Sequence, residues 1–460
     1  MAYAGLADGR DRARRPPTPE SRFPLSQLRA LRTDPLRFLI HCRAAHGDVV
    51  WLRLRVIDAY LLSHPDHIHH VLQTTQSIYD KNLAPLERLR PILGHGMVTA
   101  DGTTWKQQRE VAQPAFRGRE IQSFGPIITE VIADTIPRWR QAAVEGAPLD
   151  MHREMLRMAL CIVGKAMFGV DLRDHAEASG DLLEVTMTSG VKRVRALIAA
   201  PMFLPTPNNR RIKSSRRALE TMIDRIVEER RAGQHDEPCL LDRLLEAHGA
   251  LEKAGRSAQF YDEAITILLA GHETTANALA FSLHLLGRHP SVVETLRAET
   301  RRVLGRRPAE IGDLPALTYT RMVIDEAMRL YPPAWIIDRN TAKDDEIDGY
   351  PIKQGSLIMV SPWVIHRHPA FWPDSERFDP ERFAKDRHQD RPRHAYLPFG
   401  LGPRVCIGAS LALTEAVMVL ASLIDLFDVE PVSGHMLRLD PNVTLRPKNG
   451  LPMTVRSTLS

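Results

Sequence analysis

Helix-type patterns follow one another almost without interruption through the middle of the chain. Apolar residues recur there at the three- and four-residue spacing of amphipathic helices. The longest pattern begins near Gln259 and ends before Pro290, because proline cannot continue a helix. We expect helices near 34–45, 66–74, 103–115, 124–145, 150–168, 178–192, 209–232, 238–248, 258–288, 291–305, 318–331 and 407–427.

Strand-like stretches are fewer and shorter, and they predict small sheets beside a dominant helical part. They lie at 49–54, 59–62, 336–341, 350–352 and 356–360. Between 366 and 405 the chain is proline-rich and has little periodicity, which is more typical of a functional segment than of a plain linker. No Gly/Ser linker divides the chain. We therefore expect a flexible N-terminal arm over 1–22 and a single, mainly α domain with small β-sheets over 23–460.

Composition excludes several classes of protein. Of the 460 residues, 43% are hydrophobic and 25% are charged, which excludes a disordered chain. The formal charge of +5 is small for this length and does not indicate a nucleic-acid partner, although a local basic face remains open. There is neither a secretory signal pattern nor a run of 18 apolar residues, so we expect a cytoplasmic protein without a membrane anchor.

Cysteine use points to one position. The four cysteines, Cys42, Cys161, Cys239 and Cys406, are too far apart for a disulfide scaffold or a zinc cluster. Cys406 follows two glycines and comes directly before a helix pattern, where free N–H groups and the helix dipole favour an anion. This environment is expected to lower the pKa of the thiol, and a thiolate held there suits an axial ligand of iron.

Two helical segments carry further polar residues. In Ala270-Gly-His-Glu-Thr-Thr275, Gly271 weakens the helix, and Thr274 and Thr275 can donate to carbonyl groups four residues back and bend it. The segment is then either a groove that holds dioxygen and water or a polar patch beside a packing glycine. A zinc-protease HExxH motif fails, because position 276 is alanine.

Glu326 and Arg329 share a helix face at i, i+3, a spacing that recurs elsewhere in the chain, where we expect solvated pairs. Apolar residues precede Glu326, and Phe378-Asp-Pro-Glu-Arg-Phe383 follows later. Trp105 and Arg109 share a face at i, i+4, which is also what a half-buried Trp beside an exposed Arg would show.

Together these segments resemble the cytochrome P450 family. Residues 399–408 match the heme-binding pattern FGxGxRxCxG, 270–275 match the oxygen-activation motif, and WxxxR and ExxR occur in the family's order. The resemblance covers the chain from about Leu25 onward. It implies a triangular, mainly helical prism that binds heme b (iron protoporphyrin IX), with Cys406 as the thiolate ligand of the iron.

The resemblance also assigns the other site residues. It makes Glu273 and Thr274 the catalytic pair that delivers protons. A buried network of Glu326, Arg329 and Arg382 would tie the irregular segment to the helices. Heme contacts fall to Trp105, Arg109, Ala270, Gly271, Arg339, Phe399, Gly400, Arg404, Cys406 and Gly408, and an apolar substrate pocket to Leu86, Leu93, Val98, Leu268, Trp335 and Ile336.

The implied reaction is monooxygenation of a hydrophobic small molecule, a terpenoid or a fatty acyl chain, of the kind found in secondary metabolism. Oxygen would come from O2, and electrons from a separate ferredoxin or flavodoxin. Lys106, Arg117, Arg119 and Arg393 offer such an acidic partner a docking face, or are a solvated surface. Alternatives are a heme-thiolate isomerase, dehydratase or peroxygenase, a non-catalytic heme sensor or carrier, and a helical scaffold without a cofactor.

Overall fold

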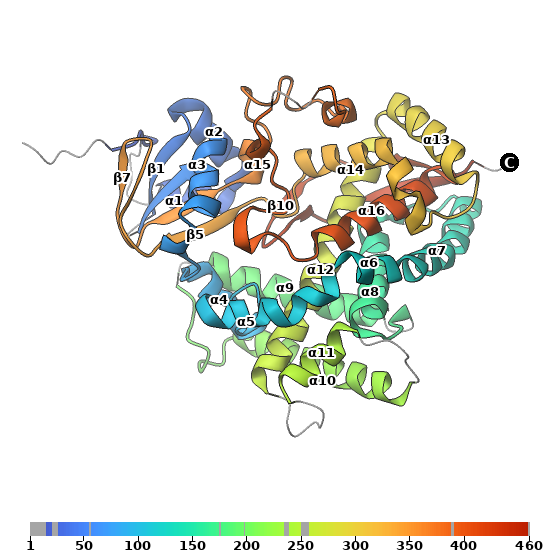
Figure 1. Ribbon diagram of the computed structural model, residues 1–460, viewed down its shortest axis with the longest axis horizontal. Helices are drawn as coiled ribbons and strands as arrows, with labels where there is room; N and C mark the ends of the chain where they lie inside the picture. Colours follow the sequence, from blue (N-terminus) through green and yellow to red (C-terminus); the bar gives the residue numbers. More distant parts are fainter. Residues whose placement is uncertain are drawn as a thin grey trace, which may run out of the picture. The chain divides into compact units, whose positions relative to one another are not determined.

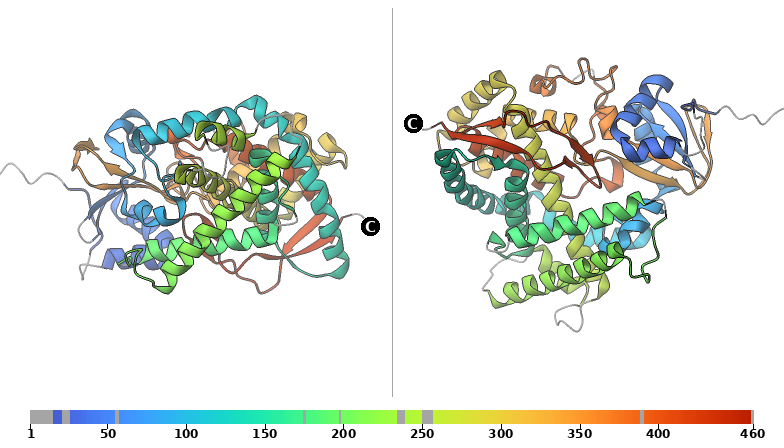
Figure 2. Two further views of the ribbon diagram at one scale, coloured as in Figure 1. Left: turned by 90° about the horizontal axis from the view of Figure 1, so that it is seen from below. Right: turned by 180° about the vertical axis from the view of Figure 1, so that it is seen from behind.

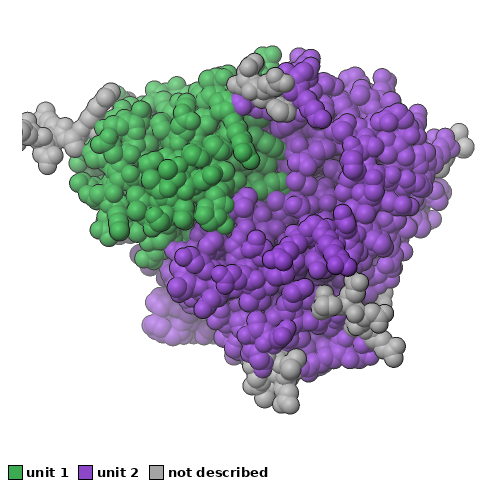
Figure 3. Space-filling view, in the orientation of Figure 1, with its two compact units in different colours: residues 1–83, 336–375, 392–403 green, residues 84–335, 376–391, 404–460 purple. Residues whose placement is uncertain are grey.

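The computed structural model describes residues 15–20, 26–54, 57–173, 176–196, 198–233, 239–249, 257–387 and 391–458. The chain divides into two compact units, coloured separately in Figure 3. The first unit comprises Met1–Leu83, Ile336–Ser375 and Pro392–Pro403. The second unit comprises Ala84–Trp335, Glu376–Arg391 and Arg404–Ser460. The expected single domain over 23–460 stays a prediction.

The first unit is built on a five-stranded sheet in the order β1-β2-β8-β5-β3. Strand β2 pairs with β8 in parallel, and the other neighbours are antiparallel. Apolar side chains from the sheet and the short helices pack into one core, in which Leu62, Ile68 and Val360 are fully buried. The elements of this unit, shown in Figure 1, are α1 (Ser26–Thr33), α2 (Pro35–His46), β1 (Val49–Leu54), β2 (Ile57–Leu62), α3 (Pro65–His69), β3 (Tyr79–Asp80), β5 (Ile337–Thr341), β6 (Asp345–Ile347), β7 (Tyr350–Ile352), β8 (Leu357–Val360) and α15 (Pro362–Ile365).

Part of the expected N-terminal arm contacts this sheet. The backbone N–H of Trp51 donates to the Pro17 carbonyl oxygen at 2.9 Å, and the Arg15 guanidinium lies 4.9 Å from the centre of the Trp51 ring system. The Gln27 side chain also donates to the Pro19 carbonyl oxygen at 2.9 Å. Residues 1–14, 21 and 22 of the arm lie outside the described residues.

The second unit is mainly helical, and its longest helix, α12, packs against α8, α14 and α16. Its strands form a three-stranded sheet in the order β4-β12-β9 and the two-stranded hairpin β10-β11. Its helices are α4 (Ala84–Leu93), α5 (Gly102–Ala112), α6 (Gly118–Ser123), α7 (Gly125–Glu145), α8 (Met151–Phe168), α9 (Ala176–Arg195), α10 (Pro207–Ala232), α11 (Leu240–Ala247), α12 (Ala258–Leu286), α13 (Pro290–Leu304), α14 (Thr318–Leu330) and α16 (Ala409–Ile424). Its strands are β4 (Leu149–Asp150), β9 (Phe427–Pro431), β10 (Leu439–Pro441), β11 (Leu445–Pro447) and β12 (Pro452–Ser457).

Local signals explain several helix boundaries. The Ser257 side chain accepts the Phe260 N–H at the start of α12, and Asp34 and Asp150 cap α2 and α8 in the same way. Pro290 begins α13 rather than ending α12, which stops at Leu286. Within the described residues, none of the helices combines the length and apolar character that crossing a bilayer requires.

The expected fold class, mainly α with small β-sheets, is confirmed. Two expected helices end early and continue in another form: a π-helix follows α3 over His70–Thr74, and a 3-10 helix follows α5 over Gln113–Phe116. The expected helix 407–427 begins at Ala409. Helix α4 was not expected, because Pro91 lies inside it. Strands β9 to β12 were also not expected: β10 and β11 have only three residues each, and β12 pairs with β9 and with the distant β4.

Candidate active site

Helix α12 is buried on nearly all sides, and one narrow face is the exception. From Asp262 to Leu286, the residues that are not buried are Ile267, Ala270, Gly271 and Thr274. Their spacing of i, i+3, i+4 and i+7 places them on one stripe of the helix. Ala270 and Gly271 add little bulk to this stripe, so a flat group can lie close to the helix backbone there.

Gly271 and Thr274 have separate roles on this stripe. A Cβ atom at Gly271 would lie 2.9 Å from Cγ2 of Val163 on α8, so the glycine permits close packing of the two helices. Thr274 Oγ1 donates to the Ala270 carbonyl oxygen at 2.8 Å, which is a bond to the residue four positions back. Helix α12 continues through this segment without interruption. Because the Thr274 proton is engaged, the oxygen can accept a hydrogen bond from a group on the stripe.

Glu273 points away from the stripe, although it is the neighbour of Thr274. It is 8% exposed, and its Oε1 lies 3.9 Å from Nη1 of Arg446 on β11. Burial raises the pKa of the Glu273 carboxyl, while Arg446 and a hydrogen bond with Thr444 act in the opposite direction. The predicted acid is therefore a buried group held against the β10-β11 hairpin.

His272 belongs to the core rather than to a metal site. It is 4% exposed, and burial lowers its pKa to about 3, so it is neutral near pH 7. Position 276 is a buried alanine. No group of three or more candidate metal-ligating side chains occurs in the described part of the chain.

Cys406 differs from the other cysteines in exposure. Cys42 and Cys161 are buried, and burial raises their pKa values to about 12 and about 11. Cys239 is half-buried, and Cys406 is exposed. All four are free thiols. Cys406 is therefore the most solvent-exposed of the four cysteine residues.

The surroundings of Cys406 act on its thiol in two directions. Loss of hydration raises its pKa, although solvent reaches the residue, while a hydrogen bond from the Gly408 N–H and the charge of Arg109 lower it. We interpret the combination as a sulfur that lies in a recess with protein around it. The prediction that the pKa of the Cys406 thiol is lowered is wrong for the protein without a cofactor. Desolvation raises this pKa by more than the Gly408 N–H and the Arg109 charge lower it.

Trp105, Arg109 and Arg404 form a cluster beside Cys406. Arg109 Nη1 donates to the Val405 carbonyl oxygen at 3.0 Å. The guanidinium groups of Arg404 and Arg109 lie 4.2 Å and 5.8 Å from the centre of the Trp105 ring system. Arg404 also pairs with Asp101 and donates to the Ala100 carbonyl oxygen at 3.2 Å. The structure thus brings the three predicted residues together and adds an acidic partner, Asp101.

The remaining predicted heme contacts belong to the first unit. Arg339 is 8% exposed and its Nη1 donates to the Asp338 carbonyl oxygen at 2.8 Å. Phe399 and Gly400 are half-buried, and Gly400 has a φ of +75°. Gly402 has a φ of +73°, and a Cβ there would lie 1.9 Å from the Leu72 carbonyl oxygen. Only glycine fits at 402, for both conformational and steric reasons.

The structure brings Glu326, Arg329 and Arg382 together. Glu326 and Arg329 are both fully buried, and two hydrogen bonds of 2.6 and 2.8 Å join them. Arg382 Nε lies 3.4 Å from Glu326 Oε1, which also accepts the Asp379 N–H at 3.0 Å. Arg329 donates to the Arg377 carbonyl oxygen at 3.1 Å. The network therefore fixes the backbone of 377–382 to α14.

The predicted pocket residues are placed in different surroundings. Leu268 is fully buried, Leu93 is 4% exposed, and Trp335 is 7% exposed with its Nε1 donating to the Asn442 carbonyl oxygen at 2.9 Å. Leu86 and Val98 are half-buried in the second unit, as is Ile336 in the first. A separate cavity of about 460 Å³ in the second unit contains none of them and is lined by Arg90, His95, Ala100, Asp101, Thr104, Ala258, Gln259 and Asp262.

Three residues near the site were not singled out from the sequence. Ile267 is the accessible neighbour of Leu268, and its spacing from Ala270, Gly271 and Thr274 was the available signal. Asp101 directly precedes a helix, which is typical of a capping residue, but its pairing with Arg404 had no local signal. Arg446 likewise had no signal, because its contact with Glu273 joins distant segments.

The donor set of the second unit fits an iron porphyrin. It offers one accessible thiol with an N–H donor on its sulfur, and two arginines and a tryptophan N–H suited to carboxylate groups. The low-bulk stripe of α12 offers a surface for a flat macrocycle, and α16, which begins just after Cys406, packs against α12.

Comparison with known proteins identifies similar chains. The family model described as "Cytochrome P450" matches residues 16–452. Cyclooctat-9-en-7-ol 5-monooxygenase of Streptomyces melanosporofaciens is 36% identical over 416 residues, which cover 90% of this chain and 89% of that protein. Cyclooctatin synthase of the same organism is 34% identical over 89% of both chains. Pentalenene oxygenase of Streptomyces avermitilis is 32% identical over 90% of this chain and 89% of that protein.

Proposed function

This chain belongs to the cytochrome P450 family and is a heme-thiolate monooxygenase with heme b as its cofactor, and from that premise we propose that its substrate is a terpenoid hydrocarbon or alcohol. The similarity to two proteins named for the oxidation of cyclooctat-9-en-7-ol and pentalenene, each over about nine-tenths of this chain, carries the proposal. The apolar side chain of Ile267, which is accessible on the stripe of α12, agrees with such a substrate.

The bound heme supplies activation of dioxygen, and its thiolate ligand favours cleavage of the O–O bond. We assign the thiolate to Cys406. The Gly408 N–H donates to its sulfur, and the positive charge of Arg109 acts on it, so both would stabilise the thiolate that holds the iron. Arg109, Trp105 and Arg404 are proposed to hold the carboxylate groups of the macrocycle. Arg404 would then either leave Asp101 to bind a carboxylate of the macrocycle or bind both carboxylates at once.

Protons are proposed to reach the stripe of α12 from Glu273. Burial raises the pKa of the Glu273 carboxyl and so favours its protonated form, which is the form that donates a proton. Thr274 Oγ1, which donates to the Ala270 carbonyl oxygen, can accept a hydrogen bond from a water or a protonated group on the stripe and so hold the proton donor in place. Because Glu273 faces the hairpin, its carboxyl must rotate or act through water to reach Thr274.

We propose a ferredoxin or a flavodoxin as the electron donor. Lys106, Arg117 and Arg119 are exposed on α5 and at α6 in the second unit, and Arg393 is exposed in the first. These cations suit a small acidic redox protein. A cytoplasmic location is proposed with this partner.

The cofactor assignment is tested by the carbon monoxide spectrum of the reduced protein. Wild type is expected to show the absorption of a thiolate-ligated heme, and Cys406→Ala is expected to lose it. Cys161→Ala, a buried free cysteine, serves as the matched control and should retain the spectrum. An unchanged spectrum in Cys406→Ala would contradict the assignment.

The substrate proposal is tested by ligand-induced changes in the heme spin state. Polycyclic terpenoid alcohols are expected to give the largest response, fatty acids of equal carbon number a smaller one, and small polar compounds none. Isotope-labelled O2 then reports incorporation of one oxygen atom into the product. If a fatty acid gave the largest response, the proposal of a terpenoid substrate would be wrong. Turnover with peroxide alone would favour a peroxygenase.

The proton route is tested with Thr274→Val, and Thr275→Val serves as the control. Thr275 is the buried neighbour, so its substitution has a similar steric cost without changing the stripe. Thr274→Val is expected to lower the product formed per NAD(P)H, because it removes a group that guides proton transfer, and Thr275→Val is expected to leave this ratio unchanged. If both variants form the same amount of product per NAD(P)H, Thr274 has no part in proton transfer.

A further inference from the structure

On the buried side of α12, polar side chains form a hydrogen-bonded chain that ends at Glu273. Asn277 lies one helical turn after Glu273 and is fully buried. Its Nδ2 donates to Thr444 Oγ1 at 3.3 Å, and its Oδ1 lies 2.8 Å from Nε2 of His152. Thr444 in turn shares a hydrogen bond with the Glu273 carboxyl. Three segments that are far apart in the sequence therefore contribute to the surroundings of one carboxyl group.

Regular elements of the second unit hold the members of this chain. Helices α8 and α12 pack side by side, and the hairpin β10-β11 contacts α12 (Figure 2). His152 belongs to the first turn of α8, where its backbone N–H donates to Asp150 Oδ1 at 3.1 Å. Thr444 lies in the turn of the hairpin, to which Trp335 is bonded through the Asn442 carbonyl oxygen at 2.9 Å. The fold itself therefore fixes the geometry of the chain.

The donors of the chain all point toward Glu273. Burial lowers the pKa of His152, so its imidazole is neutral near pH 7. Because the amide nitrogen of Asn277 faces Thr444, its oxygen faces His152, and the imidazole proton lies on Nε2. The Thr444 oxygen accepts from Asn277, which leaves the hydroxyl proton for the Glu273 carboxylate. The chain thus provides a hydrogen bond that favours the ionised form of Glu273.

Charged groups around Glu273 act in both directions. Burial raises the pKa of its carboxyl, and the negative charges of Glu184 on α9 and Asp440 on β10 add to this effect. Arg446 on β11 and the Thr444 hydroxyl lower the pKa. Both groups that favour the carboxylate come from the hairpin, and both attract a neutral carboxyl much less than an anion.

We propose that Thr444 is a positioning residue: it holds the ionised carboxylate of Glu273 at the hairpin and releases the carboxyl toward Thr274 once it is protonated. Asn277 fixes the direction of the Thr444 hydroxyl. The proton that Glu273 takes up from solvent is the one it delivers to the stripe, and the resulting carboxylate returns to Thr444. This role rests on the proposed function of Glu273 as proton donor, and it names the group that controls which way the carboxyl faces.

The experiment is an infrared pH titration of the full-length, heme-containing protein, which needs no substrate. The bands of the Glu273 carboxyl are identified by their absence in Glu273→Gln. Thr444→Val removes the hydroxyl and keeps the shape of the side chain. At a fixed pH within the titration, it should lower the ratio of ionised to protonated Glu273 by about threefold to tenfold, as for loss of one hydrogen bond. Thr444→Ser keeps the hydroxyl and should titrate like wild type.

Further variants test the support and the release of the carboxyl. Asn277→Leu removes the bond that directs the Thr444 hydroxyl and should lower the same ratio by a smaller factor. Thr274→Val should change the stretching frequency of the protonated carboxyl, because the released group bonds to Thr274, whereas Thr444→Val should not. Thr300→Val, at a threonine of α13 that is 1% exposed, is the matched control and should titrate like wild type.

Three outcomes would overturn the proposal. The first is an unchanged ratio in Thr444→Val, because the hydroxyl would then not hold the carboxylate. The second is an equal change in Thr444→Ser, which would indicate a loosened hairpin rather than a lost hydroxyl. The third is a protonated band that responds to Thr444→Val and not to Thr274→Val, since the carboxyl would then stay at the hairpin. The heme absorption of each variant shows that it is folded.

The role of Glu273 as proton donor fails separately. Product per NAD(P)H is measured with the terpenoid alcohol that gives the largest spin-state response. If Glu273→Gln forms as much product as wild type, Glu273 is not the donor, and the positioning by Thr444 has no part in the reaction. If Glu273→Gln forms less product while Thr444→Val titrates like wild type, the donor role stands and the positioning role is wrong.

Discussion

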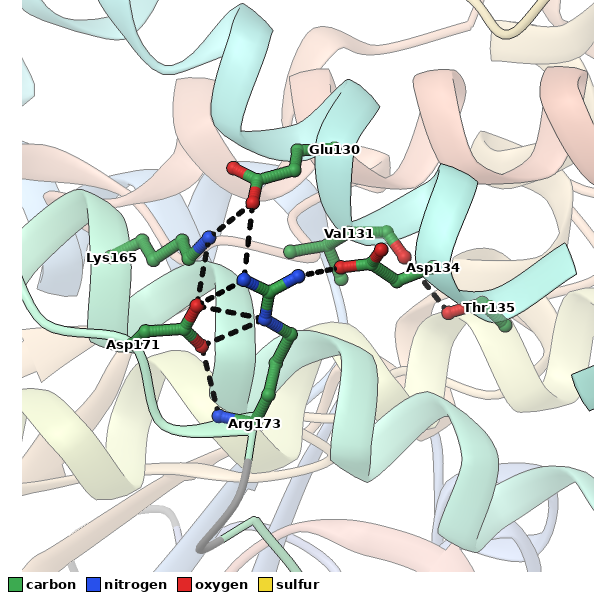
Figure 4. Close-up of polar contacts among 7 residues, drawn as sticks. All are labelled: Glu130, Val131, Asp134, Thr135, Lys165, Asp171 and Arg173. Atoms are coloured by element: carbon green, nitrogen blue, oxygen red, sulfur yellow. Dashed lines mark hydrogen bonds and ion pairs between the residues drawn. The ribbon is translucent and has the colours of Figure 1, made fainter. Parts of the chain in front are cut away.

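Two charge networks in the second unit contain similar groups in opposite environments. In the first, the side chains of Glu326 and Arg329 are 0% exposed and that of Arg382 is 11% exposed. In the second, shown in Figure 4, Arg173 lies among Glu130, Asp134 and Asp171, and its side chain is 36% exposed. Lys165 joins this network by contacts of 2.6 Å to Glu130 and 3.1 Å to Asp171.

The difference shows that the number of ion pairs does not measure their importance. Water can solvate each member of the Arg173 network after a partner is lost, so each pair contributes little. No water reaches the Glu326 carboxylate, which must be neutralised by protein groups. The buried network also bonds to the backbone of 377–382, a segment with little regular structure of its own. Glu326 accepts a hydrogen bond from the Asp379 N–H, and Arg329 donates one to the Arg377 carbonyl oxygen. Burial therefore turns a pair of charges into a determinant of local structure.

The largest effect is expected for Arg329→Ala. This substitution strands the Glu326 carboxylate and should lower the free energy of unfolding by about 3–5 kcal/mol, with loss of bound heme. Urea unfolding and the heme content per chain are the measurements. Arg321→Ala is the matched control, because Arg321 lies on the same helix and pairs with Asp325 at 2.8 Å, but its side chain is 45% exposed. Equal destabilisation by both variants would contradict the importance of burial.

An intermediate effect is expected for Glu299→Ala. Glu299 on α13 is 8% exposed and accepts the N–H groups of Tyr319 and Thr320 on α14 at 2.7 and 2.8 Å, so this buried carboxylate is satisfied by neutral donors. Its removal leaves the start of α14 without these acceptors and should cost about 2 kcal/mol. Urea unfolding of Glu294→Ala, at an exposed position of α13, gives the baseline. If Glu299→Ala and Glu294→Ala have the same free energy of unfolding, the hydrogen bonds of the buried Glu299 carboxylate do not stabilise the protein.

A small effect is expected for Arg173→Ala, although Arg173 contacts three carboxylates. The loss should not exceed about 1 kcal/mol at low salt and should decrease at high salt, because salt screens exposed charges. Urea unfolding at two salt concentrations measures it. A loss as large as that of Arg329→Ala would mean that the network in Figure 4 acts as a buried one.

The smallest effect concerns the pH dependence of Asp171. Partial burial alone would raise the pKa of the carboxyl, but hydrogen bonds from Arg173 and Lys165 outweigh it and lower the pKa to about 2. A depressed pKa stabilises the folded state above the ordinary value of 3.8, and this stabilisation is lost as the pH falls toward 2.

The Asp171 side chain is 38% exposed, so the contribution should stay below about 1 kcal/mol. The difference in unfolding free energy between wild type and Asp171→Asn is expected to narrow as the pH falls from 6 to about 3. A difference that widens over this range would show that the pKa is raised instead.

Much of the helical framework could be predicted from the sequence. The expected helices 124–145 and 150–168 correspond to α7 and α8, whose boundaries follow from the glycines at 146 and 169 and the cap at Asp150. Such signals act over a few residues, so they survive without knowledge of packing. The C-terminal strands could not be predicted in this way, because β9 and β12 pair with each other and β12 pairs with β4.

The ExxR pairs show the same limit within the site. The sequence contains this spacing at several helices, and the structure gives the pairs different partners. Glu87 and Arg90 form an exposed pair at 2.5 Å, Glu154 pairs with Arg138 instead of its neighbour Arg157, and Glu299 caps α14. Burial distinguishes the pair at 326 and 329, and burial is a property of the packed chain.

The sequence by itself determined which residues could hold the cofactor: a thiol in a glycine-rich turn before a helix, and Trp105 and Arg109 on one helix face. These depend on backbone geometry over at most a few residues. Only the tertiary structure decided that Ile267, Ala270, Gly271 and Thr274 form the accessible stripe of α12, that Glu273 faces Arg446, and that Arg404 pairs with Asp101. Contacts between residues far apart in the chain follow from how helices and hairpins fill space together, and no local pattern records that.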